Sequence, residues 1–245
     1  QDLGGFALPS DAVGFFLPLD LARLQVAHLA PFADPATVDI SLNGEPVPSL
    51  QDFEYGDSTE YINLPEGTYD VEIFPDGSST AAISAMGVDL TGAMDYTAIA
   101  IGDGVNQDLA LKLLVDNNTA PAAGNFKLRL GHLAPFANTL AGTTADVRLD
   151  DDSLTLLDDV VFGDVDVAYQ EFPAGTYDLK ITTPDGATTL INLAPVTFTE
   201  GQIVSAFAVG NGTIQDLGGF ALPSDAVGFF LPLQVYNIYL PIIFR

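Results

Sequence analysis

PEGTYDVEIF, the segment at residues 65–74, places an alternating run of apolar and acidic side chains directly after a Pro-Glu-Gly turn. Tyr69, Val71 and Ile73 are apolar or aromatic, and the two residues between them are acidic. This period of two is typical of a β-strand with one face in the core and the other in water. We therefore expect the three apolar side chains to lie in a core and the two acids to face solvent.

The same pattern returns in the second half of the chain as PAGTYDLKI at 173–181, where Tyr177, Leu179 and Ile181 take the apolar positions. Two other motifs repeat at similar offsets of 104 and 108 positions: LQVAHLAPFA at 24–33 returns as LRLGHLAPFA at 128–137, and AIGDGVNQDL at 100–109 returns as AVGNGTIQDL at 208–217. Offsets that differ by only a few positions indicate tandem structural repeats, each with the size of one domain.

Short strands separated by Gly, Pro, Asn-Gly and Asp-Gly turn signals are expected throughout both repeats. The sequence predicts an all-β fold of two tandem immunoglobulin-like or transthyretin-like antiparallel β-sandwiches, plus an extra N-terminal strand segment. In the first repeat we expect strands at 22–30, 37–42, 58–64, 80–88, 95–102 and 107–115. The predicted division is a strand segment at 1–20, a first sandwich at 21–116, a linker at 117–124, a second sandwich at 125–233 and an apolar tail at 234–245.

A second kind of repetition stands apart from the first. Residues 1–19, QDLGGFALPSDAVGFFLPL, are identical at every position to residues 215–233. The two long repeats share only scattered motifs, so this copy is recent or artificial. At 215–233 the segment corresponds to the closing strand region of a sandwich, whereas at 1–19 no sandwich precedes it.

The composition excludes several classes of protein. The 245 residues include no Cys, which removes disulfides and every site built on a thiolate. Seven Lys and Arg against 33 Asp and Glu give a formal charge of −26, which disfavours nucleic acid and anionic lipid as partners. No apolar run has the roughly 20 residues of a membrane-spanning helix. We expect a soluble, processed or excised piece.

Candidate sites for chemistry are few. His28 and His132 occupy equivalent positions, but neither unit has a second His to help hold a metal, so we interpret both as held by backbone hydrogen bonds. The acids at 150–152 and 158–166 are interpreted as a solvated acidic stretch, with calcium as a minor option because the spacing is not that of an EF-hand. We expect no cofactor, no metal and no catalytic residues.

The Gly-rich segments at 102–104 and 210–212 lack the Lys and the helix of a phosphate-binding loop and are interpreted as hairpin turns. Asn117 and Asn211 each begin a glycosylation acceptor pattern. No pair of acids is singled out for glycoside hydrolysis, and neither His has a nucleophile-elbow motif beside it. A hydrolase is therefore disfavoured.

The HLAPFA opening, the PxGTYD motif and the GDG or GNG turn together resemble a bacterial family of secreted β-sandwich repeats catalogued as domain of unknown function 4397. The resemblance covers about 22–115 and 126–222. The ending YLPIIFR at 239–245 also resembles short apolar tails found on some bacterial exported proteins. Both resemblances imply an extracellular or cell-surface bacterial protein, and the family brings no catalytic residues with it.

Taken at face value, the duplicated segment gives each chain one more closing strand than it has sandwiches to close. An unpaired apolar strand leaves its backbone hydrogen-bonding groups and apolar side chains exposed, so pairing with another sheet stabilises it. We therefore expect 1–19 to add to, or to replace a strand in, the second domain of a neighbouring chain, which gives a head-to-tail homopolymer of a non-enzymatic structural protein. The expected inter-subunit contacts are Leu3, Phe6, Leu8, Val13, Phe15, Phe16 and Leu17. The alternative is a monomeric surface adhesin or carbohydrate-binding module, with surface glycans as partners and 1–19 left over from a longer tandem array.

Overall fold

The computed structural model describes residues 20–34 and 36–234. Apart from two single 3₁₀ turns, η1 (Pro48–Leu50) and η2 (Ala141–Thr143), the regular structure of these residues is entirely β. The all-β prediction is confirmed. The loop 117–124 joins two halves, called here the first unit (20–116) and the second unit (125–234), and each sheet takes its strands from one unit only. No helix among the described residues has the length and apolarity to cross a membrane.

The first unit contains two sheets packed around one core. Sheet A has the order β5 (Ile62–Pro65), β1 (Leu21–His28), β8 (Asp95–Ile101), β9 (Ala110–Asp116). Sheet B has the order β3 (Glu45–Pro46), β2 (Thr37–Leu42), β6 (Gly67–Pro75), β7 (Ile83–Leu90), with β4 (Phe53–Glu54) also paired to β2. As the alternation predicts, Val71 and Ile73 are buried in the core between the sheets, Tyr69 is half-buried against it, and Asp70 is exposed.

The second unit repeats this plan with one added strand and with one hairpin divided between two sheets. Sheet C has the order β13 (Gln170–Pro173), β10 (Asn125–His132), β18 (Ile203–Val209), β19 (Gly218–Pro223), β20 (Phe229–Leu231). Sheet D has the order β12 (Thr155–Val160), β11 (Ala145–Leu149), β15 (Leu179–Thr182), β16 (Thr189–Asn192), and a two-stranded sheet E pairs β14 (Gly175–Tyr177) with β17 (Val196–Phe198). The addition relative to the first unit is the fifth strand of sheet C, whereas sheet E has the same pairing as the first part of the β6–β7 hairpin in sheet B.

Two details differ from the sequence-based expectation. The sheets are antiparallel except for one pair in each unit, since β1 runs parallel to β8 and β10 runs parallel to β18. A parallel pair needs a crossover, and the intervening chain provides it by passing through the opposite sheet. The single strand expected at 177–181 is divided, because Tyr177 ends β14 in sheet E and Leu179 begins β15 in sheet D.

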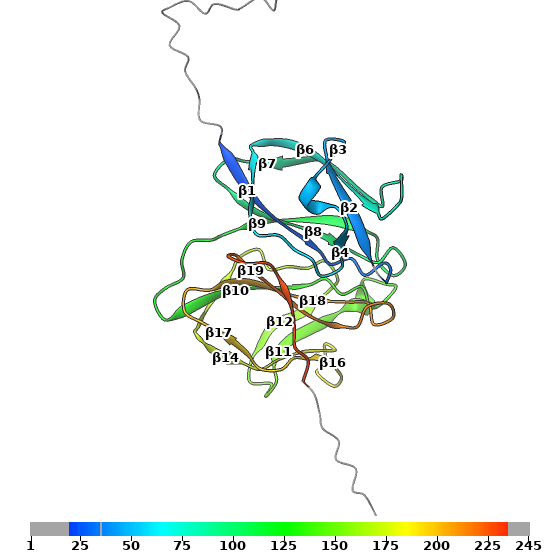
Figure 1. Cartoon of the computed structure of the whole chain (residues 1–245). Coiled ribbons are helices and arrows are strands. Elements are labelled where there is room, and N and C mark those ends of the chain that lie inside the picture. The colour runs from blue at the N-terminus through cyan, green and yellow to red at the C-terminus, as the bar shows by residue number, and fades with distance from the viewer. Residues whose placement is uncertain (1–19, 35, 235–245) are drawn as a thin grey trace, which may run out of the picture.

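The two units pack with sheet A facing sheet C, so the sheets are layered B, A, C, D (Figure 1). A third apolar cluster fills this interface, with Ala27, Ile99 and Ile101 from sheet A and Phe207 and Phe220 from sheet C among its members. Strands β8 and β18 are therefore covered on both faces, which explains their nearly unbroken apolar sequences.

Hydrogen bonds across this interface come in matching pairs. Gln107 donates to the carbonyl of Ala137 at 2.9 Å, and the equivalent Gln215 donates to the carbonyl of Ala33 at 3.2 Å. The turn of each unit also reaches the HLAPFA motif of the other through an Asn side chain, at Pro135 and Pro31. The motifs that repeat in the sequence therefore contact each other reciprocally across the interface.

Candidate functional site: the closing hairpin

Residues 215–233, the second copy of the duplicated segment, form the hairpin that ends sheet C. β19 pairs antiparallel with β18, placing Ala221 opposite Ala206, and β20 pairs antiparallel with β19, placing Phe230 opposite Phe220. Phe220 and Leu222 enter the interface between the units, while Leu231 enters the core of the second unit. The expectation that this segment closes its own second unit is confirmed, and we call it the closing hairpin.

Small residues allow the closing hairpin to pack tightly. A Cβ at Gly219 would lie 3.0 Å from a methyl of Leu193 and 3.1 Å from a methyl of Leu231. A Cβ at Gly228 would lie 2.4 Å from the ring of Phe220. These glycines leave room for the leucine and phenylalanine side chains that fill the site, so the segment is fitted to this position.

The closing hairpin also contacts the first unit. The buried side-chain amide of Gln25 donates to the carbonyls of Pro223 and Ala226, both at 3.1 Å, and the backbone N–H of Gly228 donates to the hydroxyl of Ser58. The ring of Phe230 lies 5.7 Å from that of Tyr55 between centroids. The closing hairpin is therefore held by both units at once.

The outer side of the closing hairpin is apolar and accessible. β20 is the last strand of sheet C in the described part of the chain. The exposed fractions are 52% for Val227, 50% for Phe229, 48% for Phe230 and 45% for Leu233. The backbone beside β20 is bonded at both ends, since the N–H of Gly228 donates to Ser58 and the stretch after β20 bridges Leu193 through Leu233. The exposed phenylalanines therefore form a small apolar patch on the surface.

The seven inter-subunit contact residues expected in 1–19 lie outside the described residues. Their identical counterparts in the closing hairpin show how deeply each of these side chains is buried when the segment is folded into a sheet. Those matching Phe6, Leu8 and Leu17 are buried, the one matching Leu3 packs partly against the core, and those matching Val13, Phe15 and Phe16 are half-exposed. The segment therefore presents one buried set and one accessible set of apolar side chains.

Both histidines are buried and bonded to backbone, as the sequence predicted. His28 Nε2 lies 3.0 Å from the carbonyl oxygen of Ala36, and His132 Nε2 lies 2.7 Å from that of Thr143. Burial lowers the pKa of His28 to about 4 and also lowers the pKa of His132. Each imidazole is therefore neutral at pH 7 and positions the loop that follows its strand.

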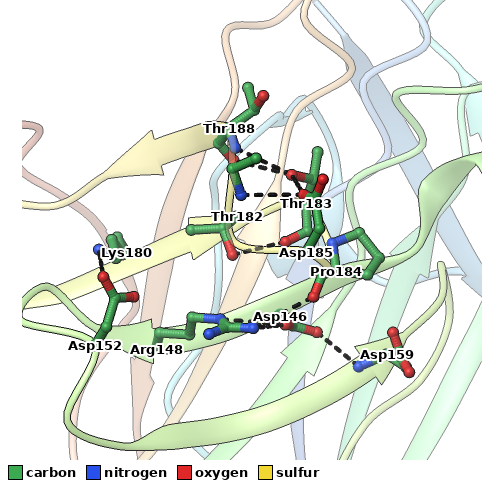
Figure 2. A network of polar contacts seen from close by, with 11 residues as sticks. Asp146, Arg148, Asp152, Asp159, Lys180, Thr182, Thr183, Pro184, Asp185 and Thr188 are labelled. Carbon is green, nitrogen blue, oxygen red and sulfur yellow. Dashed lines mark hydrogen bonds and ion pairs between the residues drawn. The ribbon is translucent and has the colours of Figure 1, made fainter.

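Several acids of the second unit are engaged in local contacts, as the network in Figure 2 shows. Asp146 accepts from the guanidinium of Arg148 and, at 2.7 Å, from the backbone N–H of Asp159. Lys180 occupies a polar position of the alternating pattern at 173–181 but is buried, and its ammonium donates to the carbonyl of Asp150 and the carboxylate of Asp152. Across the described residues, no three His, Cys, Asp or Glu side chains are grouped so as to hold a metal ion.

A buried ion pair at the unit interface was not predicted. Arg129 on β10 is 1% exposed and donates to Asp116 at 2.6 Å, while its guanidinium lies over the ring of Tyr169. Asp116 also accepts from the hydroxyls of Tyr61 and Thr97, both at 2.6 Å, and burial together with this carboxylate raises the pKa of Tyr61. These contacts join the end of the first unit to the start of the second.

The two Gly-rich segments are hairpin turns, as expected, and they meet across the interface. The side-chain amide of Asn211 donates to Asp103 at 3.3 Å. Although burial opposes it, backbone N–H donors from Gln107, Asn106 and Val105 lower the pKa of Asp103. Asn211 is buried, so in the folded chain it is not presented as a glycosylation acceptor.

Comparison with known proteins supports the family resemblance over the first unit, the loop and the beginning of the second unit. Residues 22–141 match a family described as Domain of unknown function (DUF4397). A search of curated proteins gave no match. Among solved structures, a leucine-rich repeat protein from Bacteroides thetaiotaomicron is 11% identical, with a TM-score of 0.19, over 78% of this chain and 26% of that one. The chain thus spans about a quarter of that protein's length, and a likeness at this score carries no argument about fold or function.

Proposed function

We propose that the protein is a non-enzymatic structural subunit, located outside the bacterial cell, that polymerises head to tail when residues 1–19 of one chain bind the second unit of the next. In this proposal the second unit is a further copy of the family that the first unit matches. The observation that carries the proposal is the closing hairpin, because its residues fit sheet C closely and the same residues recur at 1–19.

The arrangement of the described chain suits a head-to-tail contact. The chain begins β1 at one end of the molecule and leaves β20 at the opposite end (Figure 1). The start of β1, which follows the donor segment in sequence, and the end of β20 in the second unit therefore lie toward different ends of the described chain. Such a heterologous contact repeats without closing, which gives a filament.

The apolar content of the donor segment is sufficient for a stable joint. Three Phe and several Leu at about 1.5–3 kcal/mol each give a gross driving force of order 10 kcal/mol before the costs of ordering and association. The opposing term is electrostatic, since chains of charge −26 repel one another. Added salt screens this repulsion and should promote assembly.

Electron microscopy and light scattering of the full chain and of a chain starting at Asp20 test the proposal. We expect filaments from the full chain and folded monomers from the truncated one, because no described strand is lost by the truncation. The combined substitution of Phe6→Ser and Phe16→Ser should act like the truncation, whereas Ser10→Ala is the matched control and should assemble normally.

Filaments from the truncated chain would contradict the proposal. So would a full chain that stays monomeric at high concentration with 1–19 sensitive to protease. In either case the reading as a monomeric adhesin or carbohydrate-binding module takes its place.

A further inference from the structure

Each chain already carries a segment in the site where residues 1–19 of a neighbour would bind. The closing hairpin, residues 215–233, is identical in sequence to 1–19 at every position. Each residue of the hairpin therefore has its counterpart 214 positions earlier (215 minus 1), and identical segments make identical contacts. The two segments compete for one place on the second unit, which we call the closing slot.

The closing slot has room for one segment only. β19 covers β18 from Val204 to Val209, and the ring of Phe220 is completely buried. A Cβ at Gly228 would lie 2.4 Å from that ring and 3.0 Å from the carbonyl oxygen of Ala221. Packing of this density leaves no space for a second segment beside the first. A donor can therefore enter the closing slot only when the resident hairpin has left it.

The flanks of β20 offer a donor strand no alternative to the closing slot. The backbone N–H of Gly228 donates to the hydroxyl of Ser58, and Leu233 forms a bridge with Leu193. Addition of a strand beside β20 would break these contacts. Replacement of the hairpin by its identical copy would restore them.

The place where the closing slot ends suits a head-to-tail joint. Leu233 is 45% exposed there, where the chain leaves the second unit at the end opposite the start of β1 (Figure 1). In a bound donor this place belongs to Leu19, and β1 of the donor begins two residues later at Leu21. The body of the donor therefore starts at the surface of the acceptor, with no long connection between the two.

We propose that the closing hairpin is a built-in competitor of polymerisation: it holds the chain closed, and residues 1–19 of a neighbour take its place in the closing slot when it opens. The hairpin can leave as a unit, because no described strand follows it. The donor then regains the same contacts, including the two hydrogen bonds from Gln25. This inference rests on the proposed function and specifies its binding site and its regulation.

The competition sets the conditions for assembly. Exchange breaks and forms the same contacts, so the association of two chains is the one uncompensated cost. The resident hairpin is tethered to its slot by the turn before β19, which gives it an effective concentration of order millimolar. The natural chain should therefore stay closed in dilute solution and assemble at high concentration. Weakening the resident hairpin alone should lower the concentration required.

Matched glycine substitutions test the proposal, because Gly14 and Gly228 are the same position in the two copies. Gly228→Val forces a side chain against Phe220 in the resident hairpin and leaves the donor intact. We expect its critical concentration for assembly, measured by light scattering and electron microscopy, to fall at least about tenfold, which corresponds to about 1.4 kcal/mol. Gly14→Val weakens the donor instead. It should raise the critical concentration by a similar factor and leave the unfolding free energy of the monomer unchanged.

Disulfide cross-linking identifies the occupant of the closing slot without background, since the natural chain has no Cys. Ala7 matches Ala221, which lies opposite Ala206 on β18. In the Gly228→Val chain, Ala7→Cys with Ala206→Cys should give a ladder of linked oligomers under oxidising conditions. In the natural background, Ala221→Cys with Ala206→Cys is the matched control and should give only a link within one chain.

The outcomes separate the site from the function. Filaments of the Gly228→Val chain without the ladder, or an unchanged critical concentration in either glycine variant, would overturn the proposal and leave strand donation intact. Unfolding of the Gly228→Val chain without a ladder would also overturn it, because the donor then fails to replace the hairpin. Absence of filaments from both the natural chain and the Gly228→Val chain would contradict the proposed function itself.

Discussion

The two units cover the edge of their hydrophobic cores in different ways. In the first, β9 is the last strand of sheet A, and Leu111 and Leu113 pack against the core from that strand. In the second, the equivalent strand β19 has Gly219 and Ala221 at these places, and Leu231 from the added strand β20 enters the core. A core edge can therefore be filled by large side chains of the closing strand or by a further strand, and in the second unit the further strand leaves Phe229 and Phe230 about half exposed.

The two units also differ in the polar side chain that each sends across the interface. Gln25 in the first unit and Arg129 in the second occupy equivalent positions and each reaches the other unit's closing strand region, at the carbonyls of Pro223 and Val115 respectively. The neutral amide needs only backbone acceptors, whereas the buried guanidinium also needs the carboxylate of Asp116. Removing the polar partner should therefore cost more stability at Arg129 than at Gln25.

The largest expected effect is therefore at the ion pair. Asp116→Ala leaves a buried guanidinium without its counter-charge, and we expect it to lower the free energy of unfolding by about 3–5 kcal/mol in urea denaturation. Gln25→Leu, the matched change at the neutral position, should cost less. Equal losses of unfolding free energy in the two variants would show that the buried charge of Arg129 does not make its position more sensitive than that of Gln25.

The second largest expected effect is a loss of stability at acid pH, because the buried histidines become protonated when the chain unfolds. Burial lowers the pKa of His28 to about 4, from about 6.5 in the unfolded chain, so its contribution is complete above pH 6.5 and is lost as the pH falls toward 4. The loss for this one group is about 3 kcal/mol over that window. His28→Gln cannot titrate, so its unfolding free energy should fall less steeply with pH. Parallel pH profiles for the two chains would refute this.

The added strand gives the third effect. Leu231→Ala should cost about 2–3 kcal/mol, at the lower end for a buried leucine because a sheet edge can relax around the cavity. Leu111→Ala in the first unit removes a side chain that is only half-buried and should cost less. Thermal or urea unfolding of both variants measures the difference, and a larger loss at Leu111 would reverse our view of how the units are closed.

The smallest effects belong to ion pairs that reach the surface. Asp152→Asn in the second unit and Asp95→Asn in the first each remove one partner of a partly exposed pair, with Lys180 and Arg23 respectively. We expect losses below about 1 kcal/mol in both units, reduced further by salt. A loss of several kcal/mol in either variant would mean that the pair is not screened by water.

Much of the fold could be predicted because it depends on local pattern. The alternation at Tyr69 to Ile73 placed the right side chains in the core, and the repeated motifs located both units and the closing segment. The parallel pairs could not be predicted, since strand order depends on crossovers between sheets. Arg129 carries no local signal of burial, because its partner Asp116 comes from the other unit. The half-exposed positions of Phe229 and Phe230 likewise follow only from the assembled sheet C.

The reciprocal contacts between the units have a consequence for how the chain could diverge. In a symmetric dimer of separate chains, every substitution at the interface occurs twice and weakens an association that dilution opposes. Here the loop 117–124 makes the association intramolecular, with an effective concentration of order millimolar for a short flexible connection. Each half of the interface can then change alone. An amide at position 25 and a guanidinium at position 129 are the asymmetry that this freedom permits.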